Sequence, residues 1–141
     1  MDDLPDSTAI QAAELRSEIV RATLAYSRGK CRDGALPARA DLDPTDIPRL
    51  LPHLMLQDVR RDPWDFRYRL VGTTVREHSR RDWTGQWMRE IPGQDEESTV
   101  FRVTRWVCEH QAPAFFRPPY IGPHKEFKYC EAALLPWTGP G

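Results

Sequence analysis

Apolar side chains between residues 8 and 28 recur every three or four positions, with Arg and Glu at many of the positions between them. This period is that of a helix with one apolar face. Thr8 and Gln11 have the spacing of a capping box, and Gly29 suits a helix end. The pattern predicts a flanking amphipathic helix over residues 8–28, whose apolar face needs a partner surface. The residues predicted for this dimer and output surface are Ile10, Ala13, Ile19, Val20 and Leu24.

Residues 30–52 contain four X-Pro steps, which disfavour long regular structure and favour an ordered connector with short helical turns. One such turn is expected after Asp43, which can act as its N-cap. Residues 53–60 and 65–71 then alternate apolar and polar side chains, and the Asp-Pro-Trp sequence at 62–64 has turn composition. These features predict a β hairpin.

The second strand of this hairpin is expected to have two different faces, because side chains alternate along a strand. Arg67 and Arg69 fall on one face, where either can pair with Asp58 on the first strand and fix the register. Gly72 ends the strand. The opposite, apolar face carries Phe66, Tyr68 and Leu70.

The second half of the chain predicts helical crossover segments followed by two more strands. After a short helix beyond the hairpin, a long helix is expected from Asp95 to about Gln111. Residues 114–120 predict a third strand, edge-like because its two prolines cannot donate hydrogen bonds, and residues 125–135 alternate as a fourth. The Thr-Gly-Pro-Gly sequence at 138–141 has the composition of a hairpin turn.

The composition indicates one globular domain, since 40% of the 141 residues are hydrophobic and 29% are charged. The formal net charge is −1, and 17 of the 20 basic residues are Arg. Between residues 58 and 90, eight arginines are interspersed with six acidic residues, which indicates a solvated, salt-bridged surface. A nucleic-acid partner is not expected, because that function calls for strong net positive charge.

Nothing in the sequence indicates a membrane or secreted protein. No window approaches the roughly 18 apolar residues of a membrane span, and the acidic start Met-Asp-Asp-Leu-Pro-Asp lacks the basic region of a secretory signal. Three widely spaced cysteines without a CxxC motif predict reduced, structural thiols. A cytoplasmic protein without a membrane partner is expected.

No catalytic residue and no metal site is predicted. The four histidines lie outside any GxSxG or HExxH motif. Cys108 and His110 are two positions apart on a predicted helix and therefore point to different faces, so they are not a nucleophile with its base.

Three stretches resemble a known family in their specific residues as well as in their pattern of apolar and polar positions. They are LPARADLDPTDIPRLLPHLMLQDV at 36–59, FRYRLVGTTVREHSRRDWTG at 66–85 and AALLPW at 132–137. With the order of predicted elements, they resemble the PAS sensory-domain family, most closely the short stand-alone PAS proteins of alphaproteobacteria. Residues 82–85 look like that family's grdltG turn. The resemblance implies an α+β fold, with crossover helices on one face of a strongly bent antiparallel sheet.

The resemblance also implies a domain organisation. PAS domains have five strands, the last in the middle of the sheet, whereas this sequence shows four. We therefore expect residues 1–30 to form an N-terminal tail and flanking helix. Residues 31–141 are expected to form a PAS-like domain that is truncated at its C-terminus.

A cofactor is not expected. Some PAS domains bind haem through a His near the position of His110, but this His lies at a helix end beside a stop signal, and the cysteine motif of the flavin photosensors is absent. The interior remains open to two interpretations, a filled core or a cavity for a small, largely apolar ligand. The residues predicted to line it are Leu56, Tyr68, Leu70, Val75, His78, Trp83, Trp87, Val103, Trp106, Val107, Phe115, Phe127 and Tyr129.

The sequence thus favours a non-catalytic, bacterial sensory or regulatory module for signal transduction. It would act through a small apolar ligand, a regulatory protein partner or both, with the flanking helix as output and as the contact of a homodimer. A ligand-free scaffold for dimerisation or protein interaction is the main alternative, and an enzyme of unknown type is the least supported one.

Overall fold

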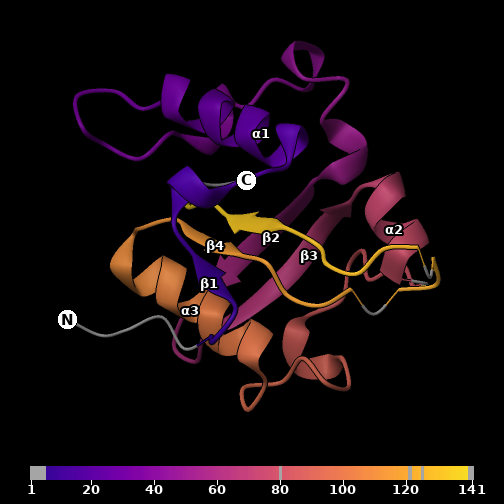
Figure 1. The fold of residues 1–141 in the computed structure, drawn as a ribbon. Coiled ribbons are helices and arrows are strands. Elements are labelled where there is room, and N and C mark those ends of the chain that lie inside the picture. The colour runs from indigo at the N-terminus through magenta and orange to yellow at the C-terminus, as the bar shows by residue number, and fades with distance from the viewer. Residues whose placement is uncertain (1–5, 80, 121, 125, 140–141) are drawn as a thin grey trace.

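The computed structural model describes residues 6–79, 81–120, 122–124 and 126–139. Figure 1 shows helix α1 (Glu18–Gly29) above the strands, helix α3 (Thr99–His110) below them and the short helix α2 (Thr73–Ser79) to one side. Among the described residues, no helix is long and apolar enough to span a membrane.

The predicted hairpin is confirmed by strands β2 (Met55–Arg60) and β3 (Asp65–Val71), which pair antiparallel. Asp58 lies opposite Arg67, and the two side chains form an ion pair of 2.8 Å. Arg69 also approaches the Asp58 carboxylate, at 3.6 Å. The expectation that Asp58 pairs with these arginines across the hairpin is therefore confirmed.

The apolar face of β3 differs from its prediction at one end. Phe66 and Tyr68 are buried as expected, but Leu70 is 41% exposed and Val71 is buried instead. The ladder shifts its register between Leu56 and Gln57, opposite Leu70 and Tyr68. A shift of this kind increases the local twist, so the end of the strand turns a different face to the core.

A second sheet contains the remaining strands in the order β1-β4-β5, namely β1 (Ala9–Ile10), β4 (Ala114–Phe116) and β5 (Ala132–Leu134). The described strands therefore form two antiparallel sheets, where one bent sheet was expected. The prediction that residues 114–120 form an edge strand is wrong. The strand ends at Phe116, before the two prolines, and lies between β1 and β5 with all three residues buried.

The predicted helix over residues 8–28 is shorter than expected and begins at Glu18. Ser17 is its N-cap and accepts a hydrogen bond of 3.2 Å from the Val20 backbone N–H. The preceding residues form β1 and a 3-10 turn, η1 (Ala12–Glu14), because pairing with β4 satisfies the backbone of Ala9 and Ile10. Ile10 and the exposed Ala13, both expected on the helix, therefore lie outside it.

The proline-rich connector forms three 3-10 turns: η2 (Arg39–Asp41), η3 (Pro44–Asp46) and η4 (Leu51–His53). Asp43 caps η3 by accepting a hydrogen bond of 3.0 Å from the Thr45 backbone N–H, as predicted. The crossover adds a further turn, η5 (Met88–Glu90), before α3. Helix α3 begins three residues later than expected, because Ser98 and not Asp95 is its N-cap.

The buried hydrophobic residues form three clusters. The first packs β3 against the crossover and α3, around Phe66, Tyr68 and Phe101. The second joins α3 to β4, and the third joins the N-terminal segment to β4 through Leu24 and Phe115. Helix α3 and strand β4 therefore hold the two sheets together.

Candidate functional site: a groove between the two sheets

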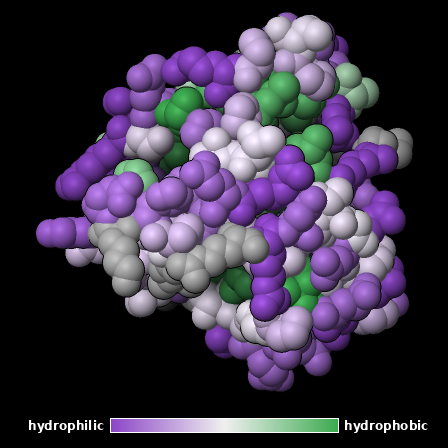
Figure 2. Space-filling model, turned by 90° about the vertical axis from the view of Figure 1, so that its right-hand side faces the viewer, coloured by the Kyte–Doolittle hydropathy of each residue, from purple (hydrophilic) through white to green (hydrophobic). Residues whose placement is uncertain are grey.

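A groove of about 1670 Å³ lies between β2 and β5. Its lining includes Leu56 and Val59 of β2, Arg69 of β3 and Leu134 of β5, so both sheets contribute to it. Figure 2 shows one side of the molecule, on which hydrophobic groups appear as separate patches surrounded by hydrophilic side chains. The larger part of the groove's wall is apolar.

Helices line the groove from two directions. Helix α3 contributes Val107 and Cys108, and α2 contributes Val75. Helix α1 contributes Ile19 and Val20, which the sequence had suggested for an outward dimer surface. A molecule in the groove would therefore touch the flanking helix directly.

The groove contains about half of the side chains predicted for a pocket. The remaining ones lie elsewhere: Tyr68, Val103 and Phe115 are buried in the three clusters, and Leu70 is exposed. The predicted residues that line the groove are Leu56, Val75, His78, Trp83, Val107, Phe127 and Tyr129.

Two tryptophans nominated for the pocket have other neighbours. Trp87 lies beside β3, with the guanidinium groups of Arg60 and Arg67 at 4.4 and 5.6 Å from its ring centroid. Trp106 packs against the second cluster and stacks on His110, with ring centroids 4.3 Å apart. His110 also lies within 2.9 Å of the Trp106 carbonyl oxygen through its Nδ1. His110 thus packs on the side chain one turn earlier in α3.

Two buried polar atoms in residues that line the groove lack a hydrogen-bond partner among the described residues, Gln57 Nε2 and Trp83 Nε1. Sequence reasoning missed Gln57. Its only signal was a polar residue directly after Met55 and Leu56 in the first half of the strand. Buried polar groups normally have partners, so these two unpaired donors are exceptions within the fold.

A cluster of rings closes the groove beside α2. His78 Nδ1 lies 2.6 Å from the Tyr120 hydroxyl, and its ring centroid is 5.0 Å from that of His124. His124 Nε2 in turn lies 3.0 Å from a carboxylate oxygen of Glu77. Phe127 packs edge-on against this cluster. The arrangement links α2 to the segment before β5, and sequence reasoning had found only His78 and Phe127.

The reactive groups near the groove are poorly suited to nucleophilic chemistry. Burial raises the pKa of the Cys108 thiol to about 11, so it is protonated near neutral pH. Burial also raises the pKa of Tyr68 to about 12, against a smaller lowering by its hydrogen bond to Gln94. All three cysteines are free, with Cys31 and Cys130 exposed and Cys108 half-buried. No group of three or more metal-ligating side chains occurs among the described residues.

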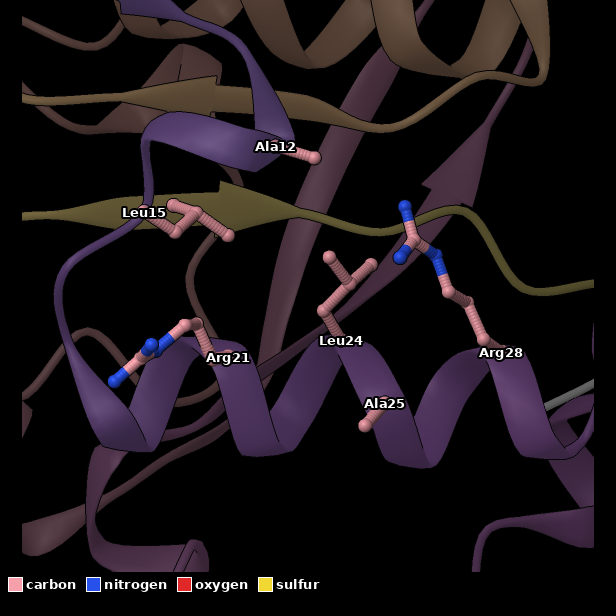
Figure 3. A pocket seen from close by; sticks show the side chains of 6 residues that line it. All are labelled: Ala12, Leu15, Arg21, Leu24, Ala25 and Arg28. Atoms are coloured by element: carbon pink, nitrogen blue, oxygen red, sulfur yellow. The ribbon is translucent and has the colours of Figure 1, made fainter.

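A second, smaller hollow of about 420 Å³ lies against α1 (Figure 3). Leu24 reaches from α1 toward Leu15 and Ala12 of the preceding turn, and Arg21 and Arg28 lie toward opposite ends. Leu15 and Leu24 are buried here in the third cluster. Leu24 of α1 is thus covered by this turn, whereas the half-buried Ile19 and Val20 face the groove.

The arrangement of mixed α and β elements around this groove agrees with one comparison. A family model described as the PAS domain matches residues 5–137, and the chain belongs to the PAS domain family. The chain has no significant match among the curated proteins or the solved structures. PAS domains are sensory and regulatory modules and are generally non-catalytic.

Proposed function

We propose that this PAS domain is a non-catalytic regulatory module that binds its signal in the groove between β2 and β5 and reports it through α1. The observation that carries the proposal is the shared lining of the groove, since Ile19 and Val20 of α1 face the same space as Leu56 and Val107. Binding and output thereby use one set of contacts.

The mechanism is a shift between packings of α1. The N-terminus of this helix is tied to β5 by the Glu131 carboxylate, which accepts hydrogen bonds from the backbone N–H groups of Arg16 at 2.9 Å and Ser17 at 2.8 Å. Near its other end, the Tyr26 hydroxyl donates to Asp46 at 3.1 Å. An occupant that contacts Ile19 and Val20 changes the position of α1 only to the extent that it binds one packing better than another.

Native mass spectrometry of the purified protein tests this proposal and reports a retained molecule and the oligomeric state together. We expect a retained species in the wild type and a loss of at least about tenfold in its occupancy in Leu56→Trp, since a ring added inside a groove excludes ligand volume. Leu70→Trp is the matched control, because Leu70 is the cross-strand partner of Leu56 but does not line the groove.

Equal retention in both variants would place the molecule elsewhere and contradict the proposal. The same spectra test the homodimer. The ligand-free dimer scaffold gains support only if the protein is dimeric and retains nothing.

A further inference from the structure

The smaller hollow against α1 lies on the other side of this helix from the groove. The residues of α1 that line it recur at the spacing of one helix face: Arg21, Leu24, Ala25 and Arg28. The residues of α1 that line the groove are Ile19, Val20, Thr23, Tyr26 and Ser27. Because successive helix residues are rotated by about 100°, the two sets point to largely opposite sides. A molecule in the hollow therefore contacts α1 without entering the groove.

The hollow combines an apolar middle with a cation at each end. Leu15 and Leu24 belong to the same buried cluster, and Figure 3 shows Leu24 between Arg21 and Arg28. Both arginines are exposed, and they are seven positions apart, which is roughly 10 Å along the helix axis. The lining thus presents a row of positive charge, apolar surface and positive charge.

Neither arginine forms an ion pair or a hydrogen bond through its side chain among the described residues. The acidic groups nearest in the sequence have other partners. Glu18, the only acidic residue of α1, pairs with Arg49 at 2.9 Å, and the Glu14 carboxylate accepts the Gln11 backbone N–H at 2.8 Å. Helix stability does not account for Arg21 either, because a cation near the N-terminal end of a helix opposes the helix dipole. Both guanidinium groups are therefore available to an anion.

The dimensions of the hollow favour a small molecule over a protein partner. Its volume of about 420 Å³ lies within the roughly 300–1,000 Å³ of small-molecule sites. Its six lining residues are far fewer than the roughly 20–30 residues that each side of a stable protein interface contributes. A single guanidinium at each end matches the single charge of a carboxylate better than the nearly double charge of a phosphate.

We propose that this hollow is a second ligand site of the domain and binds a linear aliphatic dicarboxylate across Arg21 and Arg28. Each carboxylate pairs with one guanidinium group, and the methylene chain lies against Leu15 and Leu24. The bound molecule contacts both α1 and the turn before it, and so holds the helix in this packing. The site goes beyond the proposed function, because it acts on α1 from the side that does not face the groove.

Sebacate, a linear dicarboxylate, is the probe, and the whole protein is titrated with it at constant ionic strength while its backbone amides are followed by NMR. Decanoate is the first control, since it has the same chain length with one carboxylate. Succinate is the second, since it has two carboxylates but no long apolar middle. Sebacate is expected to shift the amides of α1 and of the preceding turn, and both controls should bind at least about fivefold more weakly, because each loses an ion pair or the apolar contact.

Three variants of the same chemistry locate the bound molecule. Arg21→Gln and Arg28→Gln are each expected to abolish the preference for sebacate over decanoate, because only one guanidinium group remains. Arg102→Gln is the matched control, since it removes the same charge from an exposed position on α3 outside the hollow, and it should keep the preference. All three side chains are exposed, and circular dichroism checks that the variants are folded.

Several results would overturn the inference. Equal affinity for sebacate and decanoate, or a preference that survives both substitutions in α1, would remove the role of the two arginines. Shifts confined to groove residues such as Leu56 and Val107 would assign the dicarboxylate to the groove, and the absence of saturable binding would exclude the site. In each case the proposal for the groove is still decided separately, by native mass spectrometry of the wild type and Leu56→Trp.

Discussion

Gly72, at the exit of β3, is crowded by the backbone of the connector. A Cβ atom built there would lie 2.3 Å from the Pro52 carbonyl oxygen, and the Gly72 backbone N–H donates to Leu54 at 2.8 Å. A side chain at this position would have no room, because the crowding atoms belong to the backbone of Leu51 and Pro52. Only glycine allows the connector and the hairpin to approach this closely.

Gly72→Ala is expected to lower the free energy of unfolding by about 1–3 kcal/mol, because the added methyl group forces the connector away from the hairpin. Gly29→Ala is the matched control, since a Cβ at Gly29 meets nothing within 4 Å. Chemical denaturation of the two variants measures the difference. Equal stability would show that the connector can move without cost.

The carboxylate of Glu131 gives the fold a dependence on pH. Burial by itself would raise the pKa of Glu131, but hydrogen bonds from the Ser17 and Arg16 backbone N–H groups and from Arg117 outweigh it, and the pKa is lowered. The side chain is 9% exposed and lies 3.0 Å from the Arg117 guanidinium. A lowered pKa stabilises the folded state above the unfolded value, and this contribution is lost as the pH falls through the folded value.

We therefore expect wild-type stability to fall as the pH drops below about 4.3, the unfolded pKa of a glutamate. Glu131→Gln should be less stable than the wild type at pH 7 and should lack this part of the acid-induced loss. Glu90→Gln, at an exposed position, is the control. Thermal melts across pH 3–7 measure both effects. Parallel curves for wild type and Glu131→Gln would contradict the assignment.

At the scale of elements, α1 depends on its N-cap. The Ser17 hydroxyl accepts the Val20 N–H, while the Ser17 backbone N–H is held by Glu131. Ser17→Ala should cost about 1 kcal/mol of stability, because one N–H of the first turn loses its acceptor. Ser7→Ala, at an exposed position before β1, is the control. Urea denaturation curves of both variants measure the effect, and an unchanged midpoint for Ser17→Ala would mean that water replaces the cap.

The elements that could be predicted are those specified by local sequence. The β2–β3 hairpin has approximate alternation, a turn sequence and an ion pair between Asp58 and Arg67, all close together in the sequence. Strand β1 has only two residues, and its pairing with Phe115 and Phe116 is a tertiary contact that no local pattern reveals. The helical period over residues 8–28 therefore predicted a helix that is too long at its N-terminal end.

The candidate site was predictable to a similar degree. Residues of the crossover and β2, such as Val75 and Leu56, could be placed because their elements were correctly located. Phe115 was misplaced because it faces the N-terminal segment, whose conformation was unknown. The contribution of Ile19 and Val20 to the groove could not be foreseen, because it depends on how α1 packs against the sheets.

At the scale of the whole molecule, the groove lies between two sheets that are connected by the packing of α3 and β4. Helix α3 contributes Phe101 to the first hydrophobic cluster and Val103 to the second, while β4 contributes Phe115 to the third. The sheets are thus joined along one side and open on the other. Any occupant that bridges β2 and β5 binds the folded state alone and stabilises it by mass action.

The pairing of β1 with β4 also affects how the chain is made. Ala9 lies opposite Phe116, so β1 cannot pair until more than 100 further residues have been synthesised. The β2–β3 hairpin, in contrast, needs only its own residues. During synthesis the hairpin can therefore close early, while the N-terminal segment stays unpaired on the ribosome until β4 emerges, because contacts between distant residues form late and slow folding.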